Sequence, residues 1–409
     1  MQRFDCECGN PLFFGSSKCL RCGREVGYDA EAKAMTVVAP GCGMKRCGNA
    51  IRYGVCNWIV PAGSDEALCA ACRLNRTIPD LRDPRNVMLW GRMELAKRRL
   101  ISTLLHLGIT LPSKSESPQS GLAFDIVSSV SNPALIMGHL NGVITVNLEE
   151  ADDTYRQIHR QQLGETSRTL LGHFRHESGH YVWHRWLGNL PWDHPQRVAF
   201  CERFGSDCVD YPGALSTHYA RGARFGWEQS FISAYAASHP WEDWAETWAH
   251  YLEILEGVAT CESLGIEVSR LALPVMPFPV EAGALPPMLR QSPDADSDFL
   301  AWLLKWVRLS TTLNDISASL GEPALYPYVL STRVAQKLRL IHYFAEFWGG
   351  SANCHPNSVR VARANTNLSQ GYLTARAPVN VLHPDFSQTS RSCVPFGNSP
   401  IPGKWSSPG

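Results

Sequence analysis

Apolar side chains recur at helical spacing along five long segments of this chain, and each segment predicts an amphipathic helix. The segments span residues 83–106, 166–187, 238–252, 299–320 and 331–348. Asp83 and Pro84 are typical of a helix start, whereas Gly321 and Gly349 are typical of helix ends. Two shorter apolar segments, 122–127 and 143–148, predict strands. We therefore expect a mostly helical α+β domain over residues 83–350.

The segments between these elements are less regular. Residues 190–225 show little helical periodicity, and we expect them to form a lid or a wall beside a site. Residues 274–293 are rich in proline and predict a linker. Residues 351–409 are rich in Ser, Asn, Pro and Gly without sustained periodicity, so they predict a mostly disordered tail.

The composition indicates a globular protein without a strong electrostatic partner. Hydrophobic residues make up 44% of the 409 positions, enough for a sizeable core and more than one domain. Lys and Arg number 38, as do Asp and Glu, so the formal net charge is zero. The N-terminus has no apolar leader, and there is no run of about 18 apolar residues. We therefore expect a cytoplasmic location and no membrane partner.

Cysteines gather at the front of the chain, where nine of the fourteen lie within the first 72 residues. In a cytoplasmic protein such clusters are typical of metal ligands rather than disulfides. We expect two structural zinc modules, because four thiolates leave no open position on the ion. The first module, 1–28, has the ligands Cys6, Cys8, Cys19 and Cys22, and the second, 38–82, has Cys47, Cys56, Cys69 and Cys72.

Some features of these modules stay open. The first pair is Cys-x-Cys, where a zinc-ribbon knuckle usually has Cys-x-x-Cys, and Cys42 could replace Cys47 in the second set. Free buried thiols are the alternative to both metal sites. Residues 1–80 hold ten Lys and Arg and eight Asp and Glu, a formal +2 that two four-thiolate zinc sites would change to about −2. This charge argues against a nucleic-acid partner, and we expect a protein partner to dock on the zinc ribbon instead.

The sequence His-Glu-Ser-Gly-His begins at residue 176. Residues four apart share one face of a helix, so His176 and His180 can hold one metal ion. Glu177 lies beside them, in the position of a general base for a zinc-bound water. His173 and His184 cannot be a third ligand alongside both motif histidines. Helix geometry puts them about 10 Å from His180 and about 12 Å from His176 along the axis, whereas two zinc ligands lie little more than about 4 Å apart.

The third ligand must therefore come from another segment. An elongated HExxHxxGxxH motif is excluded, because Trp183 and Trp186 stand at its glycine and histidine positions. The helix expected at 238–252 offers Glu242 and Glu246, one turn apart beside a stripe of tryptophans. We assign Glu242 to the metal and place Glu246 behind the ligands, where it would orient a neighbouring side chain. The exchanged roles are one alternative, and an acidic face paired with solvent or arginine is the other.

Four segments of this chain resemble a bacterial family of zinc-binding metallopeptidases with an N-terminal zinc ribbon. They are residues 69–81, 138–147, 172–181 and 231–252. The resemblance covers roughly residues 1–350 and implies a zincin-like core preceded by small zinc-ribbon modules. In zincins, the sheet edge that an extended substrate joins precedes the metal-binding helix, which is where the strand expected at 143–148 falls.

The resemblance also supports Tyr235, seven residues before Glu242, as a donor to the oxyanion of the reaction. Some glutamate-ligated zincins place a donor tyrosine in a similar position. A packing role for Tyr235 is the alternative, and Tyr219 and Tyr251 are competing donors.

These features together predict a zinc-dependent metallopeptidase that hydrolyses a peptide bond with a zinc-activated water and Glu177 as general base. The expected cofactors are one catalytic and two structural zinc ions, and the expected partner is a peptide or protein substrate. A catalytically silent zinc-binding scaffold for protein interactions is the main alternative, followed by a nucleic-acid-associated factor. The complete motif favours the peptidase, because a silent protein has no need of Glu177.

Overall fold

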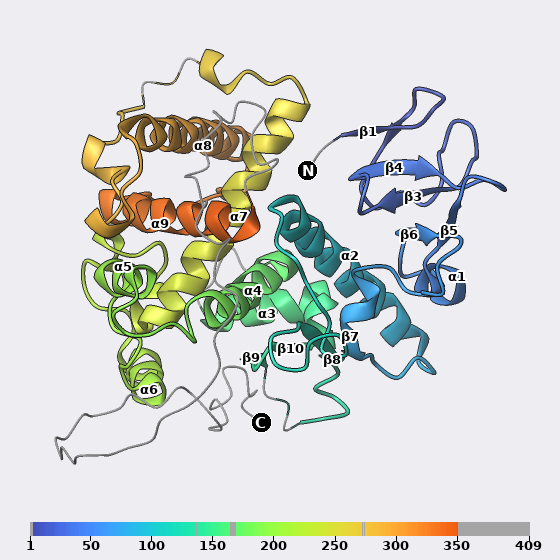
Figure 1. Cartoon of the computed structure of the whole chain (residues 1–409), viewed down its shortest axis with the longest axis horizontal. Coiled ribbons are helices and arrows are strands. Elements are labelled where there is room, and N and C mark those ends of the chain that lie inside the picture. Colours follow the sequence, from blue (N-terminus) through green and yellow to red (C-terminus); the bar gives the residue numbers. More distant parts are fainter. Residues whose placement is uncertain are drawn as a thin grey trace, which may run out of the picture.

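The computed structural model describes residues 3–133, 135, 137–163, 169–271, 273 and 275–350. The tail predicted at 351–409 lies outside these residues. The described part has the α+β architecture that the sequence predicts, with small sheets near the N-terminus followed by a helical body (Figure 1).

The N-terminal region consists of three two-stranded antiparallel sheets. Their strands are β1 (Phe4–Asp5), β2 (Pro11–Leu12), β3 (Val26–Asp29), β4 (Ala34–Val37), β5 (Met44–Arg46) and β6 (Ile59–Pro61), and the short helix α1 (Gly48–Tyr53) follows β5. Between the sheets, the Tyr28 ring lies 5.0 Å from both the Phe14 and the Trp58 rings. A sheet of two short strands is marginally stable alone, so we expect this region to need crosslinks as well as its shared core for stability.

Helix α2 (Pro84–His106) joins these sheets to the rest of the molecule. It begins where the sequence predicts, with the Asp83 carboxylate accepting a hydrogen bond from the Arg85 amide at 2.8 Å. The Arg98 guanidinium donates to the Val55 carbonyl at 2.6 Å, and the hydroxyls of Tyr28 and Ser102 lie 3.0 Å apart. The buried apolar residues of the sheets and of the helical body therefore form one continuous core.

A four-stranded sheet lies beside α2, with the strand order β7 (Asn75–Thr77), β8 (Ala123–Val127), β10 (Val143–Asn147) and β9 (Gly138–Leu140). Strands β8 and β10 are parallel, and β9 pairs with β10 through a tight hairpin. Asn141 and Gly142 in its turn have φ of 48° and 80°, a conformation that an Asn-Gly pair favours. The prediction that the 143–148 strand forms the sheet edge is wrong, because β9 covers it and forms the edge instead.

The helical body confirms the long helices that the sequence predicts. Its helices are α3 (Asp153–Leu163), α4 (Leu170–Trp186), α5 (Pro195–Phe204), α6 (Tyr211–Arg221), α7 (Pro240–Ser263), α8 (Pro293–Ser319) and α9 (Thr332–Gly349). Short 3-10 helices link them: η1 (Cys72–Leu74), η2 (Leu148–Ala151), η3 (Trp227–Gln229), η4 (Ala236–Ser238), η5 (Val268–Arg270), η6 (Val280–Ala282) and η7 (Pro287–Leu289). Side chains of Thr169, His239, Ser292 and Ser331 cap α4, α7, α8 and α9.

Two of the irregular segments differ from their predictions. Residues 190–225 contain α5 and α6, so the expectation of a barely helical stretch is wrong. These helices have 10 and 11 residues, too few for a sustained apolar period to stand out. The segment predicted as a linker at 274–293 packs onto the body, with Ala282, Leu285 and Leu289 buried.

Helices α4 and α7 cross with their backbones in contact. A Cβ atom on Gly179 would lie only 2.8 Å from the Ala245 Cα, which is closer than real Cβ contacts. The Trp244 indole donates to the Gly179 carbonyl at 2.9 Å, and the Trp248 indole donates to the Ser178 hydroxyl at 3.0 Å. This crossing fixes the face that each helix turns toward the other.

A buried ion pair fixes the rotation of α7 from its opposite side. The Lys337 ammonium on α9 lies 2.6 Å from the Asp243 carboxylate, and both side chains are almost fully buried. Since Asp243 faces α9, its neighbour Glu242 is directed toward α4. Among the described helices, none combines the length and apolar character needed to cross a membrane.

The helix crossing generates a stability prediction. Gly179→Ala should lower the free energy of unfolding by about 1–3 kcal/mol, because the added methyl group meets backbone atoms that cannot move alone. Gly91→Ala on α2 is the matched control, since its Cβ would meet Val55 at an ordinary 3.6 Å. It should be neutral or stabilising by up to about 1 kcal/mol. Urea unfolding of both zinc-loaded variants measures the difference, and equal stabilities would contradict the close crossing.

Candidate metal sites and catalytic centre

The structure brings both predicted cysteine sets together. Ligand atoms of Cys6, Cys8, Cys19 and Cys22 lie within 4.8 Å of one another, and the same holds for Cys47, Cys56, Cys69 and Cys72. The sulfur atoms are 3.7, 3.7 and 3.8 Å apart in the pairs Cys6–Cys22, Cys8–Cys19 and Cys56–Cys69. A tetrahedral zinc ion with Zn–S bonds of about 2.3 Å requires about 3.8 Å between sulfurs. Both sets therefore have the dimensions of four-thiolate zinc sites.

The surroundings of these sulfurs suit thiolates. Gly9 and Gly23 follow the two cysteine pairs of the first set with φ of 77° and 73°, as tight turns at these positions require. In the second set, the amides of Trp58 and Cys69 each donate to a cysteine sulfur at 3.4 Å. Cys42 is exposed and lies outside the cluster, so the structure selects Cys47 between these two candidates.

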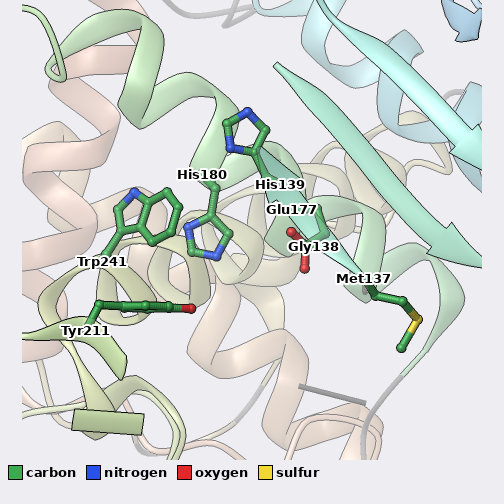
Figure 2. A pocket seen from close by; sticks show the side chains of 7 residues that line it. All are labelled: Met137, Gly138, His139, Glu177, His180, Tyr211 and Trp241. Atoms are coloured by element: carbon green, nitrogen blue, oxygen red, sulfur yellow. The ribbon is translucent and has the colours of Figure 1, made fainter. Parts of the chain in front are cut away.

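A third group of ligand atoms lies at the crossing of α4 and α7, beside a narrow pocket. The pocket is lined by Met137, Gly138, His139, Glu177, His180, Tyr211 and Trp241 (Figure 2). The edge strand β9 borders it on one side, and α6 and the start of α7 border it on the other. The Trp241 ring lies 4.0 Å from the His180 imidazole, so an aromatic wall adjoins the ligands.

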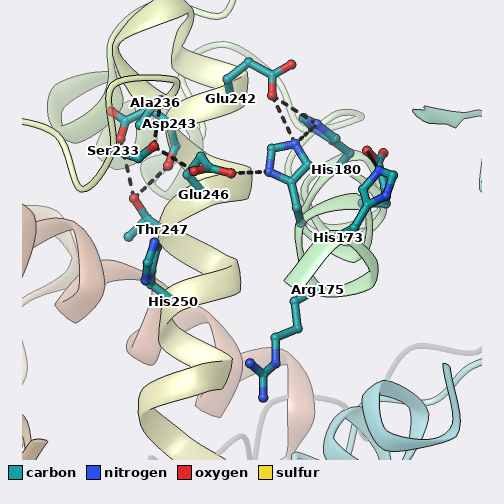
Figure 3. A network of polar contacts seen from close by, with 12 residues as sticks. His173, Arg175, His180, Ser233, Ala236, Glu242, Asp243, Glu246, Thr247 and His250 are labelled. Carbon is teal, nitrogen blue, oxygen red and sulfur yellow. Dashed lines mark hydrogen bonds and ion pairs between the residues drawn. The ribbon is translucent and has the colours of Figure 1, made fainter. Parts of the chain in front are cut away.

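His176, His180 and Glu242 form this third group (Figure 3). Their Nε2, Nε2 and Oε2 atoms are separated by 3.1 Å between the histidines, 3.1 Å from His176 to Glu242, and 3.5 Å from His180 to Glu242. Zinc with three ligands at about 2.0–2.1 Å in tetrahedral geometry requires about 3.3–3.4 Å between them. The donor set and its spacing therefore fit a zinc ion with a fourth position left for water or substrate.

The protonation of His176 shows why a cation belongs here. Burial lowers the pKa of His176, but the carboxylates of Glu242 and Glu246 outweigh burial and raise it to about 10. A proton and a metal ion therefore compete for Nε2, and metal binding would release the proton. For His180, burial is the largest effect and lowers the pKa, so this imidazole is neutral and ready to bind a metal.

Glu246 lies behind the candidate ligands. Its Oε1 is 2.6 Å from His176 Nδ1, and its Oε2 accepts a hydrogen bond from the Ser233 hydroxyl at 2.7 Å (Figure 3). The contact with Nδ1 leaves Nε2 of His176 directed to the metal position. A carboxylate in this place orients a ligating histidine and raises its basicity. The geometry thus favours Glu242 rather than Glu246 as the ligand.

Tyr211 is a residue of the site that the sequence did not point to. Its hydroxyl donates to Glu242 Oε1 at 2.5 Å, so it holds the carboxylate oxygen that faces away from the histidines. Burial and the nearby Glu242 raise the pKa of Tyr211 well above its ordinary value, which keeps the hydroxyl protonated. Tyr211 begins α6, and only a correct prediction of that short helix could have indicated it.

The predicted base and oxyanion donor also lie near the ligands. Glu177 is 1% exposed and lines the pocket, and its Oε2 has no hydrogen-bond partner among the described residues. The Tyr235 ring centre lies 6.0 Å from that of His176, and burial together with Glu242 raises the pKa of this tyrosine. Of the competing tyrosines, Tyr219 is half exposed, whereas Tyr251 hydrogen-bonds to His342 at 3.0 Å on the far side of α7.

Comparison with known proteins adds the family. Residues 86–344 match the family described as "Putative zinc-binding metallo-peptidase", and residues 3–83 match a zinc-ribbon domain. The chain belongs to this metallopeptidase family. Proteins named as uncharacterized from Mycobacterium tuberculosis and Mycobacterium bovis are 38% identical to it over 343 residues, which cover 84% of this chain and 94% of theirs. No solved structure matches the chain. In this chain, the region matched by the zinc-ribbon domain ends where α2 begins, and the region matched by the metallopeptidase family starts there.

The three ligand groups predict the metal content of this metallopeptidase-family protein. Freshly purified chain should contain three zinc ions by plasma emission spectroscopy, one of which a chelator removes more readily than the others. His176→Ala and Glu242→Ala should each lose that ion, whereas Glu246→Ala should keep it with reduced affinity. If Glu246→Ala loses the ion and Glu242→Ala keeps it, the ligand assignment is reversed.

Tyr211 generates a second prediction about the metal. Tyr211→Phe should weaken binding of the exchangeable zinc about 10- to 100-fold, because Glu242 loses the hydrogen bond that orients it. Competition with a chromophoric chelator measures this affinity. Tyr219→Phe, a change of the same chemistry on the same helix, is the control and should leave the affinity unchanged. Equal affinities in the two variants would show that Tyr211 does not orient the ligand.

Proposed function

We propose that this protein hydrolyses peptide bonds, and that Glu177 acts as the general base. The observation that carries the proposal is the Oε2 atom of Glu177, a buried carboxylate oxygen with no hydrogen-bond partner among the described residues, in the pocket that His180 also lines. A buried anionic oxygen without a partner is costly. A water held at the metal position would supply that partner.

The number of protein ligands distinguishes the proposed structural zinc sites from the proposed catalytic zinc site. Each cysteine set offers four thiolates, which complete a tetrahedral ion and support a structural role. The set His176, His180 and Glu242 offers three ligands and leaves one position for chemistry. Zinc bound there would lower the pKa of a water toward 7 and polarise a substrate carbonyl.

Glu177 is the protein side chain that would accept and then donate the proton in this reaction. Burial raises the pKa of Glu177, but the contact with His173 and the nearby His176 outweigh burial and hold the pKa below the ordinary value. Glu177 is therefore ionised at neutral pH and can take a proton from the attacking water at Oε2. It then delivers that proton to the amine that leaves when the peptide bond breaks.

Replacing the base tests the function. Glu177→Gln should keep three zinc ions and the wild-type fold, while peptide cleavage falls by about 10²–10⁴ in kcat, because the amide cannot accept the proton. Mass spectrometry of a proteome-derived peptide mixture would identify cleaved bonds and supply a substrate. Glu322→Gln, at an exposed position after α8, is the matched control.

The outcomes separate peptidase from scaffold. Cleavage by wild type and by Glu322→Gln, but not by Glu177→Gln, supports the peptidase. Wild-type protein with all three zinc ions and no cleavage of any peptide in the mixture would favour the silent scaffold.

Tyr235 gives a further prediction for the same reaction. If its hydroxyl donates to the oxyanion, Tyr235→Phe should keep zinc and fold while kcat falls by about 10²–10³ with little change in KM. Steady-state kinetics on a cleaved peptide measures both constants. A variant with near-normal kcat would assign Tyr235 a packing role against His176 and His218.

A further inference from the structure

A histidine that is not a metal ligand lies against the proposed base. His173 is one turn before Glu177 on α4, and its Nε2 lies 3.3 Å from Glu177 Oε1. The side chains are 6% and 2% exposed, so water does not screen this contact. His173 thus contacts the base at Oε1, while Oε2 is the oxygen that has no hydrogen-bond partner among the described residues.

The other ring nitrogen of His173 contacts a second buried carboxylate. Its Nδ1 lies 2.7 Å from Oε2 of Glu150, whose side chain is 4% exposed. Glu150 belongs to η2, directly after β10 of the sheet. Three groups on two elements therefore form a line from the sheet to the base: Glu150, His173 and Glu177.

Hydrogen bonds around η2 fix the position of Glu150, which is the residue of this line nearest the sheet. Asn147 caps η2 by accepting a hydrogen bond from the Glu149 amide. The Glu149 carboxylate accepts hydrogen bonds from the Ser128 hydroxyl at 2.6 Å and from the Ser129 amide at 2.9 Å. Arg156 donates to the Glu150 carbonyl. The backbone that carries Glu150 is therefore fixed on both sides.

The two contacts also fix the orientation of the ring. Each nitrogen of His173 faces a carboxylate oxygen, Nδ1 that of Glu150 and Nε2 that of Glu177. The ring therefore lies between two carboxylates. Apolar residues of similar volume often stabilise a protein as well as buried ion pairs do, so stability alone does not explain three ionisable groups in a line.

We propose that His173, held by Glu150, is a positioning residue that fixes Glu177 with Oε2 turned toward the water it deprotonates. The idea rests on the proposed function of Glu177. A glutamate side chain has three rotatable bonds, and a displacement of about 1 Å in a reacting group can cost about 10²-fold in rate. Glu150 and His173, together called the dyad, would remove this freedom, although neither belongs to the candidate ligand group or lines the pocket.

Two variants and one control test the proposal. His173→Phe should lower kcat per exchangeable zinc about 10- to 100-fold with KM within about two-fold. Glu150→Gln should lower kcat less, because the amide oxygen still accepts from Nδ1, although more weakly than a carboxylate oxygen does. His184→Phe, the same change further along α4 and outside the dyad, should leave kcat unchanged.

A binding measurement keeps the test independent of turnover. Acetohydroxamate chelates zinc while its polar hydrogens can bond to a nearby carboxylate, so its affinity reports where Glu177 lies. Calorimetry should show weaker binding to His173→Phe and Glu177→Gln than to wild type and His184→Phe, at equal zinc content. Because wild type need not cleave any peptide for this comparison, failure of the peptidase proposal leaves the measurement intact.

The results separate the possibilities. Wild-type kcat and hydroxamate affinity in both dyad variants would overturn the positioning role. Unfolding of His173→Phe would leave Glu150→Gln to decide, since that variant keeps the volume of the side chain. Loss of stability with unchanged kcat and affinity per zinc would make the dyad a structural element only.

Discussion

The close crossing of α4 and α7 is the contact on which the proposed catalytic centre depends. Gly179 lets the two backbones touch, and two tryptophan indoles bridge the helices next to it. This contact sets the face of α7 that carries Glu242 and Glu246 opposite the face of α4 that carries the two histidines. A wider crossing would separate the ligand atoms beyond the reach of one ion.

Charge is the second constraint on this centre. Glu150, Glu177 and Glu242 are buried, and Glu246 lies beside them, close to three imidazoles. Burying this many carboxylates is costly unless cations balance them. The His173 imidazole contacts Glu150 and Glu177 at one end of the group, and a divalent ion at His176, His180 and Glu242 would balance the charge at the other end. We expect the cysteine modules to need a cation for a different reason. Their short strands form sheets that are marginal alone, and zinc bound by four thiolates would crosslink them.

The sequence indicated the parts that depend on local pattern. Long amphipathic segments with clear caps became α2, α7, α8 and α9, and the four-residue spacing of His176 and His180 placed both on one face. The parts it missed depend on contacts between distant segments. Tyr211 and Glu150 reach the centre only through the packing of short elements that carry no motif of their own. The edge strand β9 had a usable local signal, the Asn-Gly turn at 141–142, that indicates a hairpin.

The most direct test of the catalytic zinc site proposed at the crossing of α4 and α7 is the position of the metal. Crystals of the full chain grown with zinc, measured at the zinc absorption edge, should show an anomalous peak between Nε2 of His176, Nε2 of His180 and the Glu242 carboxylate. Further peaks should lie within the two cysteine clusters. Peaks in the cysteine clusters with none at the crossing of α4 and α7 would contradict the central claim that this crossing builds a catalytic zinc site.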